Sequence, residues 1–297
     1  MVFFAESFPD LINKTVEEED SNRSKIETRE VALDDKDIMD VAILYGADVS
    51  RLERTDEDFF ELPVDNHFSD KRIPQGYGYK GGAVRALLLR NLGIDSTYMP
   101  RDVDVVRIAE KEPYHGADNE LAAEFMAEDF ELGDGIEAIW DEYHYFNTRD
   151  LTINEVLATD TKVKATRRCI LDNIRYVIRL SVYEMNKARS NSENKIYDKM
   201  LAKILRLYVE FIHKYDEALI EGVDNWQFEQ YFISPFWLAV QLDRAYQLSR
   251  TIAIKYVEQL KKNNQIPKEI ETPEQTAVYL SNLLTQATFH YRHAPIG

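Results

Sequence analysis

Apolar residues recur at the spacing of an α-helix through most of the chain after about residue 165, and this periodicity limits the folds open to it. The longest such segments are KIYDKMLAKILRLYVEFIHKYDEALI and PFWLAVQLDRAYQLSRTIAIKYVEQLKK, and RRCILDNIRYVIRLSVYEMNKA has the same helical spacing. Near the end, Thr272, Pro273 and Gln275 form a capping-box arrangement at the start of another helix. The pattern predicts an α-helical domain over residues 166–297.

Residues 71–165 have a different sequence pattern, which predicts one short helix next to strand-like segments. A Gly-rich connection at 73–82 leads into AVRALLLRNLG, which predicts a helix closed by Gly93. DVDVVRI (102–108) is rich in β-branched residues and predicts a strand. We therefore expect an α+β protein, in which a small mixed-sheet head domain is followed by the α-helical half.

The first 70 residues are the most acidic part of the chain, with 20 acidic and 7 basic residues in a protein of net charge −17. We interpret residues 1–70 as an acidic N-terminal extension with at least one short helix, at IMDVAILYG (38–46). Residues 162–189 carry eight basic side chains against two acidic ones. Such a run is most often a solvated helix face, and less often a surface for a polyanion. One hypothesis from complementary charge is that the acidic extension covers this basic segment.

The lack of a long apolar run and the single cysteine exclude further classes of protein. No apolar run approaches the roughly 20 residues that span a bilayer, so the sequence predicts no membrane partner. Cys169 is the only cysteine, which excludes an intramolecular disulfide and a cysteine-rich zinc site. A cytoplasmic location is the simplest expectation.

Two aspartates, Asp102 and Asp104, lie one residue apart within the predicted strand. Because alternate strand residues face the same side, their Cα atoms would lie about 7 Å apart on one face. Paired carboxylates suit hard cations, and Mg²⁺ is the usual choice where a phosphate completes the coordination shell. An isolated pair of this kind in an acidic chain is more often two solvated acids.

The pair is not isolated, because two further motifs flank it. Upstream, Gly81 and Gly82 in KGGAVR lack Cβ atoms where the backbone enters a helix, which lets amide groups approach a phosphate. Arg85 falls in the first turn of that helix, within reach of the same anion. Downstream, TRDLTINEVL (148–157) places a second Arg-Asp pair before an apolar run.

The order GGAVR, DVD and RDLTIN resembles the class II tRNA nucleotidyltransferases and bacterial poly(A) polymerases, within the polymerase-β-like nucleotidyltransferase superfamily. The corresponding family patterns are GG-x-VRD, D-[IV]-D and RRDFTINA, and LDNIR (171–175) is similar to a further element, ED-x-x-R. The resemblance covers residues 77–189. It implies a template-independent enzyme that adds NMP from an NTP to an RNA 3′ end, with a tRNA-like acceptor and a two-ion Mg²⁺ site.

The resemblance also assigns individual roles. It places the metals on Asp102 and Asp104, and Glu137 is our candidate for a third carboxylate ligand. It assigns nucleotide contacts to Gly81, Gly82, Arg85, Arg149, Asp150, Asn154, Asp172 and Arg175. The glycine motif would lie at the triphosphate, the Arg-Asp motif near the ribose, and the last pair at the base edge.

Three departures from the family patterns leave alternatives open. Ala86 replaces an acid, Thr148 replaces an arginine and Leu171 replaces a glutamate. Since nucleotide choice depends on such contacts, the identity of the NTP is not predicted. A nucleotidyltransferase acting on a protein or small-molecule hydroxyl is one alternative, favoured by the acidic extension and the small helical half. A non-catalytic nucleotide- or RNA-binding relative is another.

Overall fold

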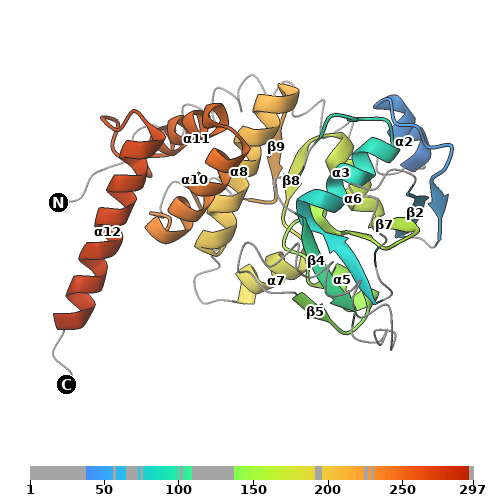
Figure 1. Cartoon of the computed structure of the whole chain (residues 1–297), viewed down its shortest axis with the longest axis horizontal. Coiled ribbons are helices and arrows are strands. Elements are labelled where there is room, and N and C mark those ends of the chain that lie inside the picture. Colours follow the sequence, from blue (N-terminus) through green and yellow to red (C-terminus); the bar gives the residue numbers. More distant parts are fainter. Residues whose placement is uncertain are drawn as a thin grey trace. The chain divides into compact units, whose positions relative to one another are not determined.

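The computed structural model describes residues 38–55, 58–64, 73, 76–98, 100, 103–108, 137–190, 196–223, 227–228 and 231–293. The described chain divides into two compact units, one ending at Asn186 and the other beginning at Lys187. Strands and helices mix in the first, and helices dominate the second (Figure 1). The α+β class predicted from the sequence is therefore confirmed.

The first unit is built on one sheet. Its strands are β1 (Glu53–Arg54), β2 (Phe59–Pro63), β3 (Tyr77–Lys80), β4 (Asp104–Ile108), β5 (Glu137–Ile139), β6 (Val156–Ala158) and β7 (Lys162–Thr166). Among the described residues they run in the order β1-β2-β7-β6-β3-β4-β5. All neighbours are antiparallel except β4 and β5, which are parallel.

Strand β2 belongs to the sheet although the sequence places it in the acidic extension. It pairs with β7 from Phe59↔Thr166 to Pro63↔Lys162, and β1 covers its other edge. Phe60 and Leu62 are buried while Glu61 between them is more exposed, so the alternation has the period of a strand. A five-residue alternation among many acids is too short to stand out in the sequence. The boundary predicted at residue 70 therefore does not mark the edge of this unit.

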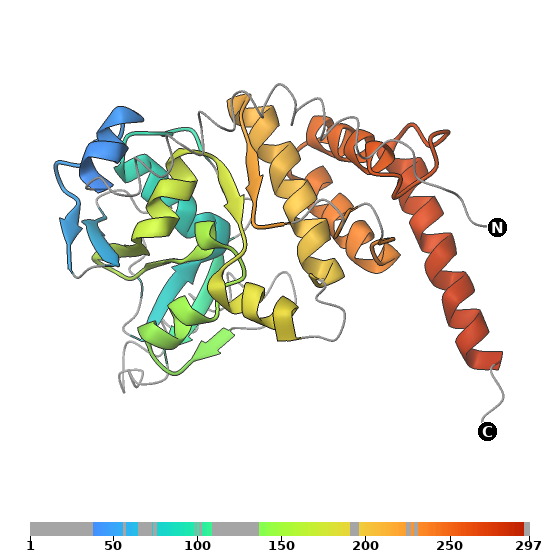
Figure 2. The same ribbon diagram turned by 180° about the vertical axis from the view of Figure 1, so that it is seen from behind.

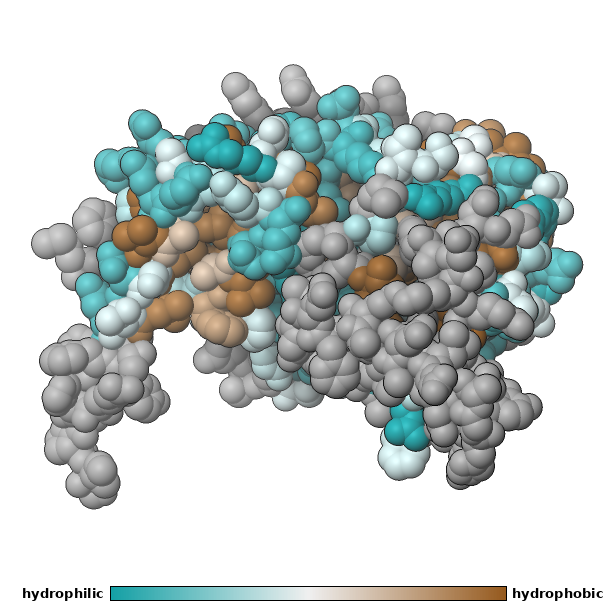
Figure 3. Space-filling view, in the orientation of Figure 1, coloured by the Kyte–Doolittle hydropathy of each residue, from teal (hydrophilic) through white to brown (hydrophobic). Residues whose placement is uncertain are grey.

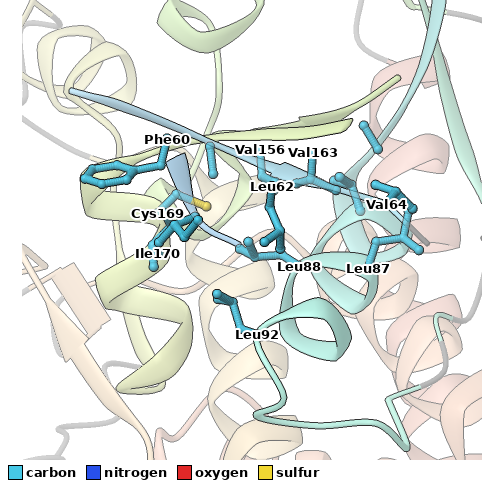
Figure 4. Packing of buried hydrophobic residues seen from close by; sticks show 14 of the residues in the cluster. Phe60, Leu62, Val64, Leu87, Leu88, Leu92, Val156, Val163, Cys169 and Ile170 are labelled. Atoms are coloured by element: carbon cyan, nitrogen blue, oxygen red, sulfur yellow. The ribbon is translucent and has the colours of Figure 1, made fainter. Parts of the chain in front are cut away.

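Helices cover both faces of the sheet. Helices α2 (Ile38–Leu44), α3 (Gly81–Asn91) and α6 (Arg167–Ile174) share the larger hydrophobic core with one face (Figure 2). In this core, Phe60 and Leu62 of β2 lie with Leu88 of α3 and Ile170 of α6 (Figure 4). Helix α5 (Glu142–Asn147) packs on the other face.

The predicted short helix at 38–46 and the helix closed by Gly93 are both confirmed, as α2 and α3. Gly93 has a φ of +68°, a left-handed backbone that glycine adopts without steric cost just beyond a helix end. The capping box of α12 (Pro273–His293) is also present, because the amide of Gln275 donates to Thr272 Oγ1 at 3.2 Å.

The helical interpretation of residues 167–188 is wrong in the middle of the segment. Helix α6 ends at Ile174, and the chain then forms β8 (Val177–Arg179) before α7 (Val182–Ser190) begins. Tyr176 has a φ of +56°, which an α-helix cannot contain. Helix α6 and β8 belong to the first unit, so the unit extends beyond the boundary predicted at residue 165.

The second unit contains α8 (Asp198–Tyr215), β9 (Leu219–Glu221), α10 (Pro235–Leu248), α11 (Arg250–Lys262) and α12. Helices α8, α10 and α11 pack side by side, and α12 packs on α10 and α11 (Figures 1 and 2). Their interface includes a buried ion pair, in which Arg206 contacts Glu210 at 2.5 Å and donates to Gln241 at 2.8 Å. None of the described helices is both long and apolar enough to cross a membrane.

Candidate functional site

The motifs singled out in the sequence meet at one end of the sheet. Strand β3 ends at Lys80 and β4 begins at Asp104, and these two residues are register partners. Strand β6 is antiparallel to β3, so the 3₁₀ helix η2 (Thr152–Asn154) that precedes β6 lies at the same end, where it contacts α3. The other predicted metal ligand, Asp102, lies outside the described residues.

Gly81 and Asp104 are in close contact. Gly81 has a φ of +65°, and a Cβ atom at this position would lie 2.8 Å from Asp104 Oδ2. Both the backbone conformation and the space therefore require glycine. A Cβ atom on Gly82 would lie 3.8 Å from Arg85 Nη2, so the guanidinium group lies beside the first turn of α3. The structure thus places Asp104 against Gly81 and Arg85 beside Gly82.

Arg85 is buried, with 6% of its surface exposed. Its Nη2 donates to the hydroxyl of Tyr98 at 3.4 Å. A buried cation at the start of a helix adds to the positive field of the backbone amides there. This end of α3 is therefore suited to an anion.

Lys80 and Glu137 lie on the same face of the sheet as Asp104. Lys80 pairs with Asp104 and Glu137 pairs with Val106, and register partners share a face. Lys80 Nζ reaches Glu137 Oε2 at 2.8 Å. The guanidinium group of Arg149 forms a second ion pair with the same carboxylate.

The surroundings of Glu137 and Arg149 fix both side chains. Partial burial raises the pKa of Glu137, but hydrogen bonds from Arg149 and Lys80 and their charges outweigh it, and the pKa falls to about 2. Arg149 is buried, donates from Nε to the carbonyl oxygen of Tyr145 at 2.8 Å, and lies 4.0 Å over the Tyr145 ring. Glu137 thus anchors two cations in this structure, and its predicted role as a third metal ligand stays a prediction.

Asp104, one of the two predicted metal ligands, lies at this end of the sheet. It is half-buried at the first position of β4, against the start of α3. Among the described residues, no group of three or more histidine, cysteine, aspartate or glutamate side chains is placed to hold a metal ion. A metal site here therefore depends on Asp104 with Asp102, which the described residues do not include.

Asp150 and Asn154 shape the turn of η2. Asp150 Oδ1 accepts hydrogen bonds from the amide of Leu151 at 2.8 Å and from Asn154 Nδ2 at 2.7 Å. Asn154 is buried and Asp150 is half-buried. The side chain of Asn154 thus holds the Asp150 carboxylate, which helps to close the turn. The nucleotide contacts that the resemblance implies for both residues stay predictions.

Asp172 lies in a different environment from the one expected for a base-reading residue. It is 0% exposed, accepts a hydrogen bond from Thr152 Oγ1 at 2.6 Å, and pairs with Arg179 Nε at 3.1 Å. Burial raises its pKa, although the charge of Arg179 opposes this. Arg175, the other residue that the resemblance places at the base edge, is the half-buried C-cap residue of α6, because the helix ends at Ile174.

Three side chains at this end of the sheet are not among those predicted. Lys80 precedes the two glycines, and only the pairing of β3 with β4 reveals that it shares a face with Asp104. Tyr145 supports Arg149. Glu155 Oε2 accepts from Thr166 Oγ1 at 2.8 Å, and burial raises the pKa of Glu155 to about 7. The sequence gives no signal for these roles, because each depends on packing.

The basic segment 162–189 is partly neutralised. Lys162 pairs with Glu61 at 2.6 Å, Lys164 pairs with Glu142 at 3.3 Å, and Arg179 pairs with Asp172. The pair between Lys162 and Glu61 joins β7 to a strand from the acidic part of the chain. The segment is therefore not one continuous surface for a polyanion.

Comparisons with known proteins add no assignment to this geometry. A scan against models of known protein families finds no match to the chain. A search of curated proteins finds no match either, so the interpretation of the site depends on its own residues.

Proposed function

We propose that the chain is a Mg²⁺-dependent nucleotidyltransferase that adds NMP from an NTP to an RNA 3′ end. The observation that supports this most directly is the contact between Asp104 and Gly81 at the start of α3. It places a carboxylate that suits a hard cation beside the amide end of an eleven-residue helix that suits a phosphate.

The residues around this contact have separate tasks in the proposal. The amide groups of Gly81 and Gly82 bind phosphate oxygens, and Arg85 supplies positive charge from behind the first turn. Lys80 supplies a second cation on the same face as Asp104. Glu137 holds Lys80 and Arg149 in position, so that neither cation has to be ordered when the nucleotide binds.

The metal would be held by Asp104 together with Asp102, whose oxygen ligands fit the preference of Mg²⁺. When bound, it supplies charge stabilisation at the attacking and leaving oxygens. The protein contributes the position and orientation of the triphosphate and excludes other geometries. The nature of the acceptor as RNA comes from the motif resemblance.

The test is incorporation from each of four labelled NTPs with Mg²⁺ into total RNA by the full chain. We expect Asp104→Asn to lower incorporation by about 100-fold or more, because one charge-stabilising group is lost. Asp243→Asn, an exposed acid on α10, is the matched control and should behave like the wild type. Circular dichroism should show the same fold for both variants. Full activity in a folded Asp104→Asn protein would rule out the metal assignment.

The same assay separates the two alternatives. Label recovered in protein or in a small molecule would change the acceptor and leave the chemistry as proposed. Calorimetric binding of NTP and Mg²⁺ without any labelled product would instead support a non-catalytic nucleotide-binding protein.

A further inference from the structure

Exposed aromatic side chains gather in the second unit, near the first residues of α8 and α10. Tyr197, Phe232 and Phe236 expose 48%, 51% and 49% of their surfaces. Phe236 is in edge contact with Trp237, with 4.9 Å between ring centroids. Hydrophobic side chains reach the surface over α10 in the space-filling view (Figure 3).

A hydrogen bond shows that the starts of the two helices are adjacent. Asp198, the first residue of α8, accepts from the amide of Ser234 at 2.9 Å, and Ser234 is the N-cap residue of α10. Tyr197 directly precedes α8, while Phe236 and Trp237 lie in the first turn of α10. The aromatic residues therefore belong to one patch.

Two lysines lie over rings of this patch. Lys199 Nζ is 5.4 Å from the centroid of the Trp237 ring, and Lys187 Nζ is 5.3 Å from that of Tyr197. Asp198, the residue before Lys199, accepts the hydrogen bond from the amide of Ser234. We call Lys187, Tyr197, Lys199, Phe232, Phe236 and Trp237 the aromatic–lysine patch.

The charge of this part of the chain permits a polyanionic partner. Residues 187–297 contain 14 basic and 13 acidic residues, whereas residues 1–70 contain 7 and 20. The patch therefore lies in a nearly neutral part of an acidic protein, and its own cations are lysines.

Exposed rings beside lysines suit one ligand better than others. Bases of a single strand can stack on aromatic rings while lysines contact the adjacent phosphates. A duplex hides the base faces inside its own stack, and an apolar protein partner would have to remove water from the ammonium groups of the two lysines. The chemistry of the patch thus favours single-stranded nucleic acid.

We propose that the aromatic–lysine patch binds single-stranded RNA by base stacking. As a site for the acceptor strand it deepens the proposed function, but RNA binding at the patch does not require transfer activity. The assignment rests on the side chains of the second unit alone.

The test measures binding of the full chain to a fluorescein-labelled 12-nucleotide single-stranded RNA by anisotropy. We expect Phe236→Ala to weaken binding about tenfold, because one stacked base is lost. Lys199→Glu, which leaves the aromatic residues in place, should weaken it at least as much at low salt and much less at high salt. Tyr246→Ala, on the same helix and 46% exposed, is the matched control and should keep wild-type affinity.

The outcomes of these experiments distinguish RNA binding at the patch from the proposed transferase activity. Lack of RNA binding by the wild type, equal losses in Phe236→Ala and Tyr246→Ala, or stronger binding of a duplex would overturn the patch assignment. Transfer to RNA with no effect of the patch variants would refute the patch alone, whereas patch-dependent binding without transfer would refute the enzyme alone.

Discussion

Charge balance around single side chains determines much of the candidate site. Glu137 pairs with Lys80, 57 residues away in the sequence, and with Arg149, 12 residues away. Removing either cation would leave the half-buried carboxylate with less compensating charge. The stability lost in this way is usually larger than the stability that the intact ion pair contributes. The three side chains therefore act as one unit, and a substitution of any of them should affect the positions of the other two.

Glu155 provides a test of the electrostatics that does not depend on catalysis. Burial raises its pKa from 4.5 to about 7, and the charge of Asp172 adds to the shift. The folded state then binds a proton more tightly than the unfolded state, so this contribution to stability is full below pH 4.5 and is lost as pH rises through about 7. Gln at this position can still accept the hydrogen bond from Thr166.

We therefore expect Glu155→Gln to unfold at a higher urea concentration than the wild type at pH 8. Its free energy of unfolding should be larger by on the order of 2 kcal/mol. The difference should disappear near pH 4, where both side chains are neutral. Glu258→Gln, an exposed glutamate on α11, is the control and should show no such trend. An increase in the free energy of unfolding of Glu155→Gln that is the same at both pH values would contradict the raised pKa of Glu155.

The turn from β3 into α3 permits a prediction at the level of secondary structure. Ala at position 81 would need a left-handed backbone, which costs about 1–2 kcal/mol, and its Cβ would displace the Asp104 carboxylate. We expect Gly81→Ala to lower stability by that amount and to abolish NTP binding. Gly82→Ala is the control for stability, because its Cβ meets only the Arg85 side chain at 3.8 Å. Isothermal calorimetry and urea unfolding of both variants would test this, and full NTP affinity in Gly81→Ala would refute it.

The elements that the sequence predicts correctly are those with strong local signals. Gly93 after a leucine-rich run ends α3, the β-branched run gives β4, and Thr272 with Gln275 caps α12. The failures come from tertiary interactions. Tyr176 interrupts a helical pattern that continues on both sides, and the break gives Asp172 a partner, Arg179, that helical spacing does not indicate.

In the candidate site, too, local sequence signals are predicted and tertiary interactions are not. The motif resemblance implies that the glycines, Arg85 and Asp104 serve one site, and the structure places Asp104 against Gly81 and Arg85 beside Gly82. The role of Lys80 is not predicted from the sequence, because its contact with Glu137 depends on the register of three strands. Sequence reasoning therefore finds the residues of a motif more readily than the residues that support them.

Across the whole molecule, the distribution of charge opposes the RNA binding that the proposed function needs. Residues 1–37 hold 11 acidic and 5 basic residues, so removing them changes the net charge from −17 to −11. The removal leaves α2 and all the strands of the sheet in the chain. The effect on RNA binding should therefore come from charge and not from loss of the sheet.

We expect the variant lacking residues 1–37 to bind single-stranded RNA several-fold more tightly than the full chain in 50 mM salt. The gain should shrink greatly at 1 M salt, where the Debye length is about 3 Å and distant charges are screened. A full-length control, with the acids of this segment replaced by Asn and Gln, should show the same gain. Anisotropy titrations at the two salt concentrations would measure it. Unchanged affinity at low salt would contradict long-range repulsion, while a gain that persists at 1 M salt would indicate that the segment blocks RNA by direct contact.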